Sequence, residues 1–214
     1  KGFLPWLLAS HADVVCLQEI KAREEDIPAE LRAPDGYHAL FHPAERPGYS
    51  GTAIYTKHEP IRIIRELGHE RFDSEGRMLA LEFKDLTVVN LYIPNGARDK
   101  RDMDYKLEVY KLLEKWVQKN SRKPVVLLGD FNIAREAIDL ARPEENEKST
   151  MFTPEERAAL ALLLEAGLTD SFRALHPRET GKYTWWPYWA NARARNLGWR
   201  IDYGLITQSL LAGL

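Results

Sequence analysis

The sequence predicts a layered α/β sandwich, in which neighbouring strands pack against a few helices. Three observations predict this class. Short apolar runs bounded by Pro and Gly recur along the chain, several of them follow one another like hairpin partners, and only a few helical segments separate them. A strictly alternating barrel would instead place a helix after every strand. The 214 residues, 44% of them hydrophobic, can bury a sizeable core, so a single domain over residues 1–214 is expected.

The first half of the chain is predicted to be rich in strands. A helix ending near Ala9 leads into the first of them, and a plausible hairpin turn at Lys84-Asp85 joins the last two. The expected strands are residues 14–18, 37–41, 52–56, 61–64, 78–83 and 87–93.

The second half is predicted to begin with an amphipathic helix and a buried strand. Apolar residues recur at helical spacing from Met103 to Val117, and the apolar run 125–129 then reads as a core strand. The charged segment 141–151 is expected to be a surface loop. Thr153 is placed as the N-cap of a helix that runs to Gly167, because Pro follows it and Glu stands three residues later.

Charge and cysteine content exclude several function classes. A net charge of −2 and a pI of about 6.4 argue against binding nucleic acid through a global positive field, so any phosphate contact must be local. No apolar stretch is long enough to span a bilayer, and no membrane partner is expected. The single cysteine, Cys16, excludes an intramolecular disulfide, fits a reducing compartment and is interpreted as an inert buried thiol.

Two acidic residues stand where predicted core strands end. Asp130 and Asn132 follow the run 125–129, and alternation along an extended chain would put them on one face with Phe131 directed into the core. Glu19 follows the strand 14–18 in the same way. Either acid alone is more often a solvated strand end, but two carboxylates from one core can hold Mg²⁺, which keeps several waters and uses few protein ligands.

Two further segments carry groups suited to phosphate or nucleic acid. Tyr92 and Asn95 could donate to phosphate oxygens, although this segment alone favours an ordinary strand tyrosine and turn asparagine. Residues 183–202 concentrate four of the six tryptophans with three arginines. Aromatic faces there could receive a base or sugar, and a hydrophobic subcore with snorkelling arginines is the alternative.

Taken together and in order, these segments resemble the exonuclease III family of abasic-site (AP) endonucleases, within the endonuclease/exonuclease/phosphatase (deoxyribonuclease I-like) superfamily. The Gln-Glu and Asp-x-Asn motifs occur throughout that superfamily, whereas the Trp-rich segment, residues 183–202, is specific to its DNA-repair branch. The matching segments are residues 17–19, 48–51, 90–95, 129–133, 152–157, 170–173 and 191–203.

The resemblance implies a four-layer α/β/β/α sandwich of two mostly antiparallel sheets flanked by helices. It implies Mg²⁺-dependent attack of water, with Mn²⁺ also open, on the phosphodiester 5′ to an abasic site in duplex DNA. Exonuclease activity from the 3′ end and 3′-phosphodiesterase or phosphatase activity are further expectations. Glu19 would ligate the metal, Asp130 would orient or deprotonate the water, Asn132 and Tyr92 would hold the phosphate, and Asp202 would orient a histidine.

DNA contacts are implied less specifically. A baseless sugar leaves room for apolar contact, which Trp199 with Phe172 or Trp186 would supply, while arginines grip flanking phosphates. The implied DNA-contacting residues are Asn95, Arg98, Phe172, Trp186, Asn191, Arg193 and Trp199.

Two parts of the family pattern are missing from the sequence. The family has an N-terminal strand with an asparagine of the metal and phosphate site, and a C-terminal Ser-Asp-His segment. The chain is therefore expected to be trimmed at both ends and to cut abasic DNA poorly as it stands. A monomer inside the cell is expected, cytoplasmic in a prokaryote and nuclear in a eukaryote.

Two other functions stay open at this point. Another phosphoesterase of the superfamily, such as a non-specific nuclease or a phosphoinositide phosphatase, would keep Glu19 and the pair Asp130 and Asn132 without needing the Trp-rich segment. A non-catalytic remnant would bind abasic DNA without cutting it.

Overall fold

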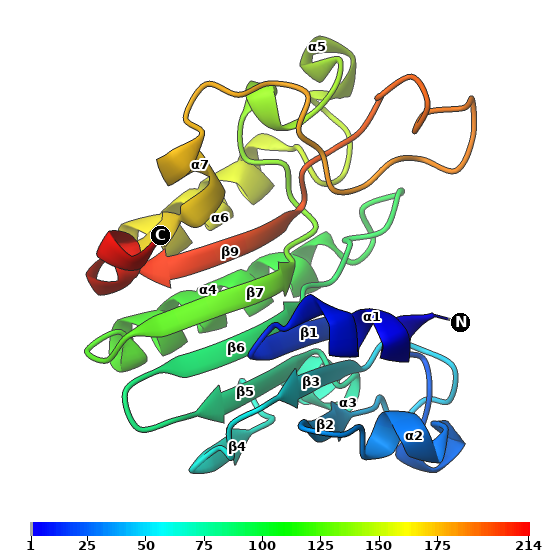
Figure 1. The fold of residues 1–214 in the computed structure, drawn as a ribbon. Helices are drawn as coiled ribbons and strands as arrows, with labels where there is room; N and C mark the ends of the chain where they lie inside the picture. Colours follow the sequence, from blue (N-terminus) through cyan, green and yellow to red (C-terminus); the bar gives the residue numbers. More distant parts are fainter. Residues whose placement is uncertain (1) are drawn as a thin grey trace. The chain divides into compact units, whose positions relative to one another are not determined.

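The computed structural model describes residues 2–214 and divides them into two compact units, residues 2–92 and 93–214. The strands belong to two β-sheets (Figure 1). The mixed α/β class with two mostly antiparallel sheets and helices, expected from the sequence, is confirmed. None of the helices within residues 2–214 combines the length and apolar character needed to cross a bilayer.

The first unit contains most of the predicted strands at the predicted places. β1 and β3 have the expected bounds, and the β5–β6 hairpin closes through a hydrogen bond from Phe83 N to Leu86 O of 2.8 Å. Its elements are α1 (Phe3–Ser10), β1 (Val14–Gln18), η1 (Glu24–Asp26), α2 (Ala29–Arg32), β2 (His38–His42), β3 (Thr52–Thr56), β4 (Arg62–Ile64), α3 (Glu70–Ser74), β5 (Met78–Glu82) and β6 (Thr87–Tyr92).

Two layers of strands face each other inside this unit. β1, β3 and β2 form one antiparallel sheet, and β4, β5 and β6 are successive antiparallel neighbours in the other. Apolar side chains fill the space between them, including Ile54, Leu79 and Leu81, with half-buried Cys16 against them. Burial raises the pKa of Cys16 to about 12, which agrees with an inert thiol.

A buried asparagine connects the two layers directly. Asn90 on β6 donates to the carbonyl oxygens of Leu17 (2.8 Å) and Ala53 (2.9 Å), and accepts a hydrogen bond from the amide of Gln18 (2.6 Å). Because buried polar groups are costly unless paired, these three bonds fix the position of β6 against the end of β1. That end carries Glu19.

The second unit combines three antiparallel strands with helices. β7, β9 and β8 lie side by side in that order, with Asp130 opposite Asp202. In Figure 1, α4 runs behind β7, and α6 and α7 lie beside β9. The elements are α4 (Met103–Asn120), β7 (Val125–Asp130), η2 (Ala137–Asp139), α5 (Pro143–Asn146), α6 (Pro154–Glu165), β8 (Leu168–Asp170), α7 (Ser171–Leu175), β9 (Asp202–Thr207) and η3 (Gln208–Gly213).

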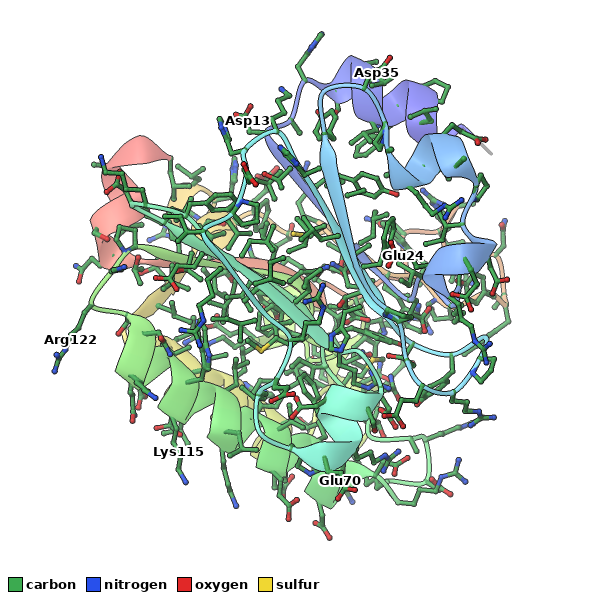
Figure 2. The ribbon with its side chains drawn as sticks, turned by 90° about the horizontal axis from the view of Figure 1, so that it is seen from below. Asp13, Glu24, Asp35, Glu70, Lys115 and Arg122 are labelled. Atoms are coloured by element: carbon green, nitrogen blue, oxygen red, sulfur yellow. The ribbon has the colours of Figure 1, made fainter. Side chains whose placement is uncertain are left out.

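The long helix α4 is amphipathic, as its spacing predicts. Its buried face carries Val109, Leu113 and Val117, whereas Lys115 on the helix and Arg122 just after it point outward (Figure 2). The stripe also includes a lysine, at position 106, that the sequence pattern did not select. Its hydrogen-bond partners include residues of the candidate site.

Two short segments show how far local sequence determines structure here. Thr153 and Glu156 form the expected capping box at the start of α6. The segment 141–151, predicted to be a loop, contains the single helical turn α5. Pro143 at its first position and two glutamates in its first turn favour that turn, because Pro presets the helical φ and acids complement the helix dipole.

Candidate active site

Glu19 stands at the end of β1 with its backbone in the left-handed region (φ 54°). The loop 48–51 holds this turn, since Ile20 N donates to Gly51 O (3.2 Å) and Lys21 N donates to Ser50 O (2.9 Å). Gly51 is required because its φ is +83° and an added Cβ would lie 2.8 Å from Ile20 Cγ1. The result is an exposed carboxylate on a well-anchored backbone.

Glu19 and Tyr92 are brought together, although 73 residues separate them. The phenol of Tyr92, the last residue of β6, donates a short hydrogen bond to Glu19 Oε1. The other carboxylate oxygen of Glu19 lies 3.3 Å from Lys21 Nζ. Tyr92, which an ordinary strand position could also explain, thus contacts Glu19, a predicted site residue.

Arg77 contacts both the ring and the main chain of Tyr92. Its guanidinium carbon lies 4.5 Å from the centre of the Tyr92 ring, and its Nη1 donates to Tyr92 O (3.1 Å). Its Nε donates to Glu75 (2.5 Å), and its Nη2 donates to the hydroxyl of Tyr49 (3.0 Å). Sequence reasoning missed this arginine, because an arginine just before a strand is ordinarily exposed, whereas only 4% of this one is accessible.

In the second unit, Asp130 and Asn132 form a closed pair. Asn132 donates from its main-chain N to Asp130 Oδ1 (2.8 Å) and from its amide to Asp130 Oδ2 (3.0 Å). The two side chains meet, but the strand alternation that was expected to put them on one face is not the reason. β7 ends at Asp130, and Asn132 has a left-handed backbone (φ 52°) that turns it back. Phe131 is fully buried, as expected.

Asn95 joins the same cluster. Its amide donates to Asn132 Oδ1 (3.0 Å), while the amide of Asn132 also donates to Ile93 O (2.9 Å). Asn95, Asp130 and Asn132 therefore form one connected network, called here the Asp130 network. Asn95 is exposed and Asn132 is 4% exposed, so the network reaches from the protein interior to the surface.

A buried ion pair lies beneath this network. Lys106 on α4 donates to Glu156 Oε1 (2.5 Å), Asn132 O (2.7 Å) and Asn95 O (3.2 Å), and both charged side chains are 0% exposed. Burial lowers the pKa of Lys106, and the Glu156 carboxylate opposes that shift. Sequence reasoning missed Lys106, but its place three and four residues before buried Val109 and Tyr110 is a readable signal.

Asp202 begins β9 directly opposite Asp130 in the strand register. Its main-chain N donates to Thr184 Oγ1 (3.2 Å), and its side chain is hydrogen-bonded to the same threonine. Burial raises the pKa of Asp202, and the Thr184 bond partly offsets this. Because Ser-Asp-His is absent from the sequence, the predicted role of Asp202 toward a histidine stays a prediction.

Arg200, two positions before Asp202, anchors the segment that leads into β9. Arg200, 3% exposed, donates to Asp139 Oδ1 (2.9 Å) and Asp170 Oδ2 (2.7 Å). Arg173 pairs with the same oxygen of Asp139 (2.6 Å). These four residues form a compact network of alternating charge, which fixes the path of the chain into β9.

Three of the predicted DNA-contacting residues surround one pocket. Trp186, Asn191 and Arg193 line a cavity of about 390 Å³, and the Arg193 guanidinium lies 5.4 Å from the centre of the Trp186 ring. Tyr188 lines the same cavity and is 97% exposed, while its neighbour Trp189 is 68% exposed. Exposed aromatic side chains of this size suit stacking against a base.

The other predicted DNA contacts are placed differently. Trp199 is 8% exposed and packs edge-on against Phe152 in a small core, so the subcore interpretation describes it well. Phe172 lies on α7 beside Arg200 (5.4 Å) and His176 (4.9 Å) rather than at the cavity. Arg98 is exposed in the segment before α4.

The donor types suit a hard divalent cation that keeps much of its water. Glu19 is an exposed carboxylate, and the Asp130 network supplies carboxylate and amide oxygens. No group of three or more His, Cys, Asp or Glu that could hold a metal occurs within residues 2–214. Each of these donors, taken by itself, is of the oxygen type that Mg²⁺ or Mn²⁺ binds together with water and substrate.

Comparison with known proteins places the chain in a family. The sequence model of the Endonuclease/Exonuclease/phosphatase family matches residues 1–212. An exodeoxyribonuclease of Bacillus subtilis (strain 168) is 41% identical over 209 residues, which cover 97% of this chain and 82% of the relative. The DNA repair nuclease APEX1 of Danio rerio is 41% identical over 217 residues, 100% of this chain and 70% of the relative.

Solved structures agree. An AP endonuclease from Archaeoglobus fulgidus superimposes with a TM-score of 0.89 at 32% identity, covering 98% of this chain and 82% of that protein. The 3′ phosphatase NExo from Neisseria, bound to a product DNA hairpin, gives a TM-score of 0.89 at 31% identity, covering 97% and 81%. The chain is therefore a phosphodiesterase of the AP endonuclease and exodeoxyribonuclease type. It belongs to the exonuclease III family of AP endonucleases, within the endonuclease/exonuclease/phosphatase superfamily.

Proposed function

We propose that this nuclease hydrolyses the phosphodiester 5′ to abasic sites in duplex DNA by metal-dependent attack of water. The observation that carries the proposal is the pairing of Asp130 with Asn132, which presents an oriented carboxylate at the end of β7. The relationship to proteins described as AP endonucleases and DNA-repair nucleases supports the choice of substrate.

Asp130 is assigned to the attacking water. The water gives a proton to the carboxylate as its oxygen attacks phosphorus, and the 3′ oxygen of the preceding nucleotide leaves. Asn132 fixes the carboxylate for this step, since one main-chain and one side-chain N–H both point at it. A carboxylate held by two donors loses little freedom when it meets the water, and such positioning is a large part of phosphoryl-transfer catalysis.

Phosphate contacts are assigned to Asn95, Asn132 and Tyr92. Both amide hydrogens of Asn132 are engaged, by Asp130 and by Ile93 O, so a phosphate contact from Asn132 must replace one of them. Asn95 uses one amide hydrogen for Asn132, which leaves the second as a donor that requires no rearrangement. The phenol of Tyr92 exchanges its bond to Glu19 for one to phosphate.

Glu19 is assigned as the protein ligand of the metal, because it is an exposed carboxylate on a fixed backbone. A bound Mg²⁺ supplies charge neutralisation at the phosphate oxygens.

DNA is held locally rather than by net charge, which is −2. The pocket around Trp186, Asn191 and Arg193 combines an aromatic face, an amide and a guanidinium, the groups that contact bases and phosphates. The exposed Tyr188 and Trp189 extend this surface.

The test compares three substrates at equal concentration: a duplex with one abasic site, the same duplex undamaged, and an inositol phosphate. Incision of the abasic duplex 5′ to the site is expected at a rate above that on the undamaged duplex, even where that rate is low, and it should depend on Mg²⁺ or Mn²⁺ and be abolished by a chelator. Asp130→Asn serves as the matched variant, because it keeps the shape of the side chain and removes the base. Equal cleavage of damaged and undamaged DNA, hydrolysis of inositol phosphate alone, or abasic-DNA binding without incision would reject the proposal.

A second activity is favoured by one of the structural relatives. The Neisseria protein of similar fold is described as a 3′ phosphatase in complex with a product DNA hairpin. Removal of a 3′ phosphate uses the same attack of water on a phosphorus atom, so the assigned residues would serve it unchanged. Release of inorganic phosphate from a nicked duplex ending in 3′ phosphate tests it, and Asp130→Asn should abolish both activities together.

A further inference from the structure

A lysine with no accessible surface is an unusual feature that the proposed reaction does not use directly. Lys106 has all three of its ammonium donors engaged, one by Glu156 and two by main-chain carbonyls. Those carbonyls belong to Asn132 and Asn95, the two amides of the Asp130 network. A buried charge is expensive, so a position that keeps one with every donor satisfied calls for a specific explanation.

Glu156 completes the arrangement on the other side. Besides Lys106, its carboxylate accepts hydrogen bonds from Met151 N (3.0 Å) and Thr153 N (3.0 Å), the second as part of the α6 capping box. Lys106 and Glu156 therefore connect α4, the start of α6 and two loops that carry amide side chains. An apolar pair could fill the same volume, but it could not bond to the two carbonyls.

The bond to Asn132 has a particular consequence. Its backbone is left-handed, a conformation that a non-glycine residue holds only when its surroundings enforce it. Lys106 donates to the main-chain carbonyl of Asn132, while Asp130 accepts a hydrogen bond from the main-chain N of the same residue. The orientation of the Asn132 side chain toward Asp130 therefore depends on both.

We propose that Lys106 is a positioning residue for the hydrolysis, which fixes the main chain of Asn132 and Asn95 so that their amides hold Asp130 and the phosphate. The inference rests on the proposed function, because the reaction it serves is the one assigned above. Lys106 itself touches neither water nor phosphate. Glu156 balances the charge of the ammonium, whereas the two carbonyl bonds of Lys106 carry the positioning.

Two variants separate positioning from simple stability. Glu156→Gln removes the counter-charge, preserves the capping box because Gln also serves at that position, and leaves Lys106 able to donate to both carbonyls. The double variant Lys106→Met with Glu156→Gln leaves no uncompensated buried charge, and it removes both carbonyl bonds. If the double variant does not fold, Lys106→Gln with Glu156→Gln replaces it. The glutamine at position 106 has a shorter side chain than lysine and ends in an uncharged amide.

The readouts are kcat, KM and the side-chain amide signals of Asn95 and Asn132 in 15N NMR spectra of the free protein. The double variant should keep its KM and lose kcat by on the order of 10- to 100-fold, the scale of a small misplacement. Its two amide signals should shift or broaden, while Glu156→Gln keeps kcat within about threefold of the parent.

Unchanged kcat and unchanged amide signals in the folded double variant would overturn the inference. A loss confined to KM would also overturn it, because that outcome indicates weaker binding rather than misplaced groups. The amide signals are measured without substrate, so an inactive parent protein would refute the proposed function and still leave the positioning of Asn132 testable.

Discussion

Asn132 turns back on Asp130 from a left-handed backbone, and its main-chain N and side-chain amide bond to the two carboxylate oxygens at 2.8 and 3.0 Å. Backbone and side chain therefore make separable contributions. Asn132→Gly keeps the backbone easily and deletes the amide, whereas Asn132→Ala deletes the amide and adds strain. Both should lower kcat strongly, and the Ala variant should be less stable than the Gly variant by about 1 kcal/mol.

Steady-state kinetics and urea unfolding of the two variants check this. An Ala variant as stable as the Gly variant, or more stable, would mean that the left-handed backbone at position 132 carries no strain that glycine relieves. Retention of kcat in either one would show that the amide is dispensable for orienting Asp130.

Glu19 should control the metal requirement. Glu19→Gln keeps an acceptor for the Tyr92 phenol and removes the negative charge, so the fold and the Tyr92 contact should survive. The Mg²⁺ concentration for half-maximal activity should rise by on the order of tenfold or more, because hard cations prefer carboxylates to neutral amides. A magnesium titration at saturating substrate measures it.

Glu24 provides the matched control for that titration. It is an exposed glutamate in the same unit (Figure 2), and Glu24→Gln removes the same charge from the surface. The control should leave the half-saturating Mg²⁺ concentration unchanged. Equal shifts in both variants would indicate a general charge effect and not ligation by Glu19.

The regular elements were predictable because their signals are local. β1 and β3 have the predicted bounds, since apolar runs ending at breakers define a strand within a few residues. The start of α6 was predictable from Thr153 and Glu156 alone. The turn α5 was missed, because a four-residue helix depends on little more than Pro143 and its neighbours.

The candidate site was predictable only in part, for a different reason. Glu19, Asp130 and Asn132 mark strand ends and can be found along the sequence, and the family resemblance favoured the phosphate roles of Tyr92 and Asn95 that the residues alone left open. The supports of these residues come from distant segments: Arg77 stacks on Tyr92 and Lys106 bonds to Asn132. Long-range contacts of this kind leave no periodic signal, and an arginine or lysine is ordinarily expected at the surface.

The pKa of Asp202 gives a prediction with a definite sign. Burial raises it and the Thr184 hydrogen bond lowers it, so Thr184→Val should raise it further. A raised pKa in the folded state gives stability that is present below the unfolded pKa and is lost as the pH rises through the folded pKa. Thr184→Val should therefore destabilise the protein more at neutral pH than in acid.

Carboxyl 13C chemical shifts of Asp202 across pH, together with unfolding at acid and neutral pH, measure both effects. In an Asp202→Asn background, Thr184→Val should cost the same stability in acid as at neutral pH, because an amide does not titrate. A lower Asp202 pKa in Thr184→Val would contradict the assigned role of the hydroxyl.

The network of Arg200, Arg173, Asp139 and Asp170 should make a large contribution to the free energy of unfolding around the start of β9. Arg200→Met leaves the buried Asp170 carboxylate without its partner at 2.7 Å, whereas Asp139 keeps Arg173 at 2.6 Å. Removing one partner of a buried pair typically costs about 3–5 kcal/mol, and urea unfolding should show a loss on that scale.

Two further variants identify charge as the cause of that loss. Arg195→Met, at an exposed position of the same segment, should change stability by about 0.5 kcal/mol or less. Adding Asp170→Asn to Arg200→Met should recover part of the loss, because the orphaned charge is then gone. A loss no larger than that of Arg195→Met would mean that the network is held by packing on Tyr203, whose ring lies 4.3 Å from the guanidinium, and not by charge.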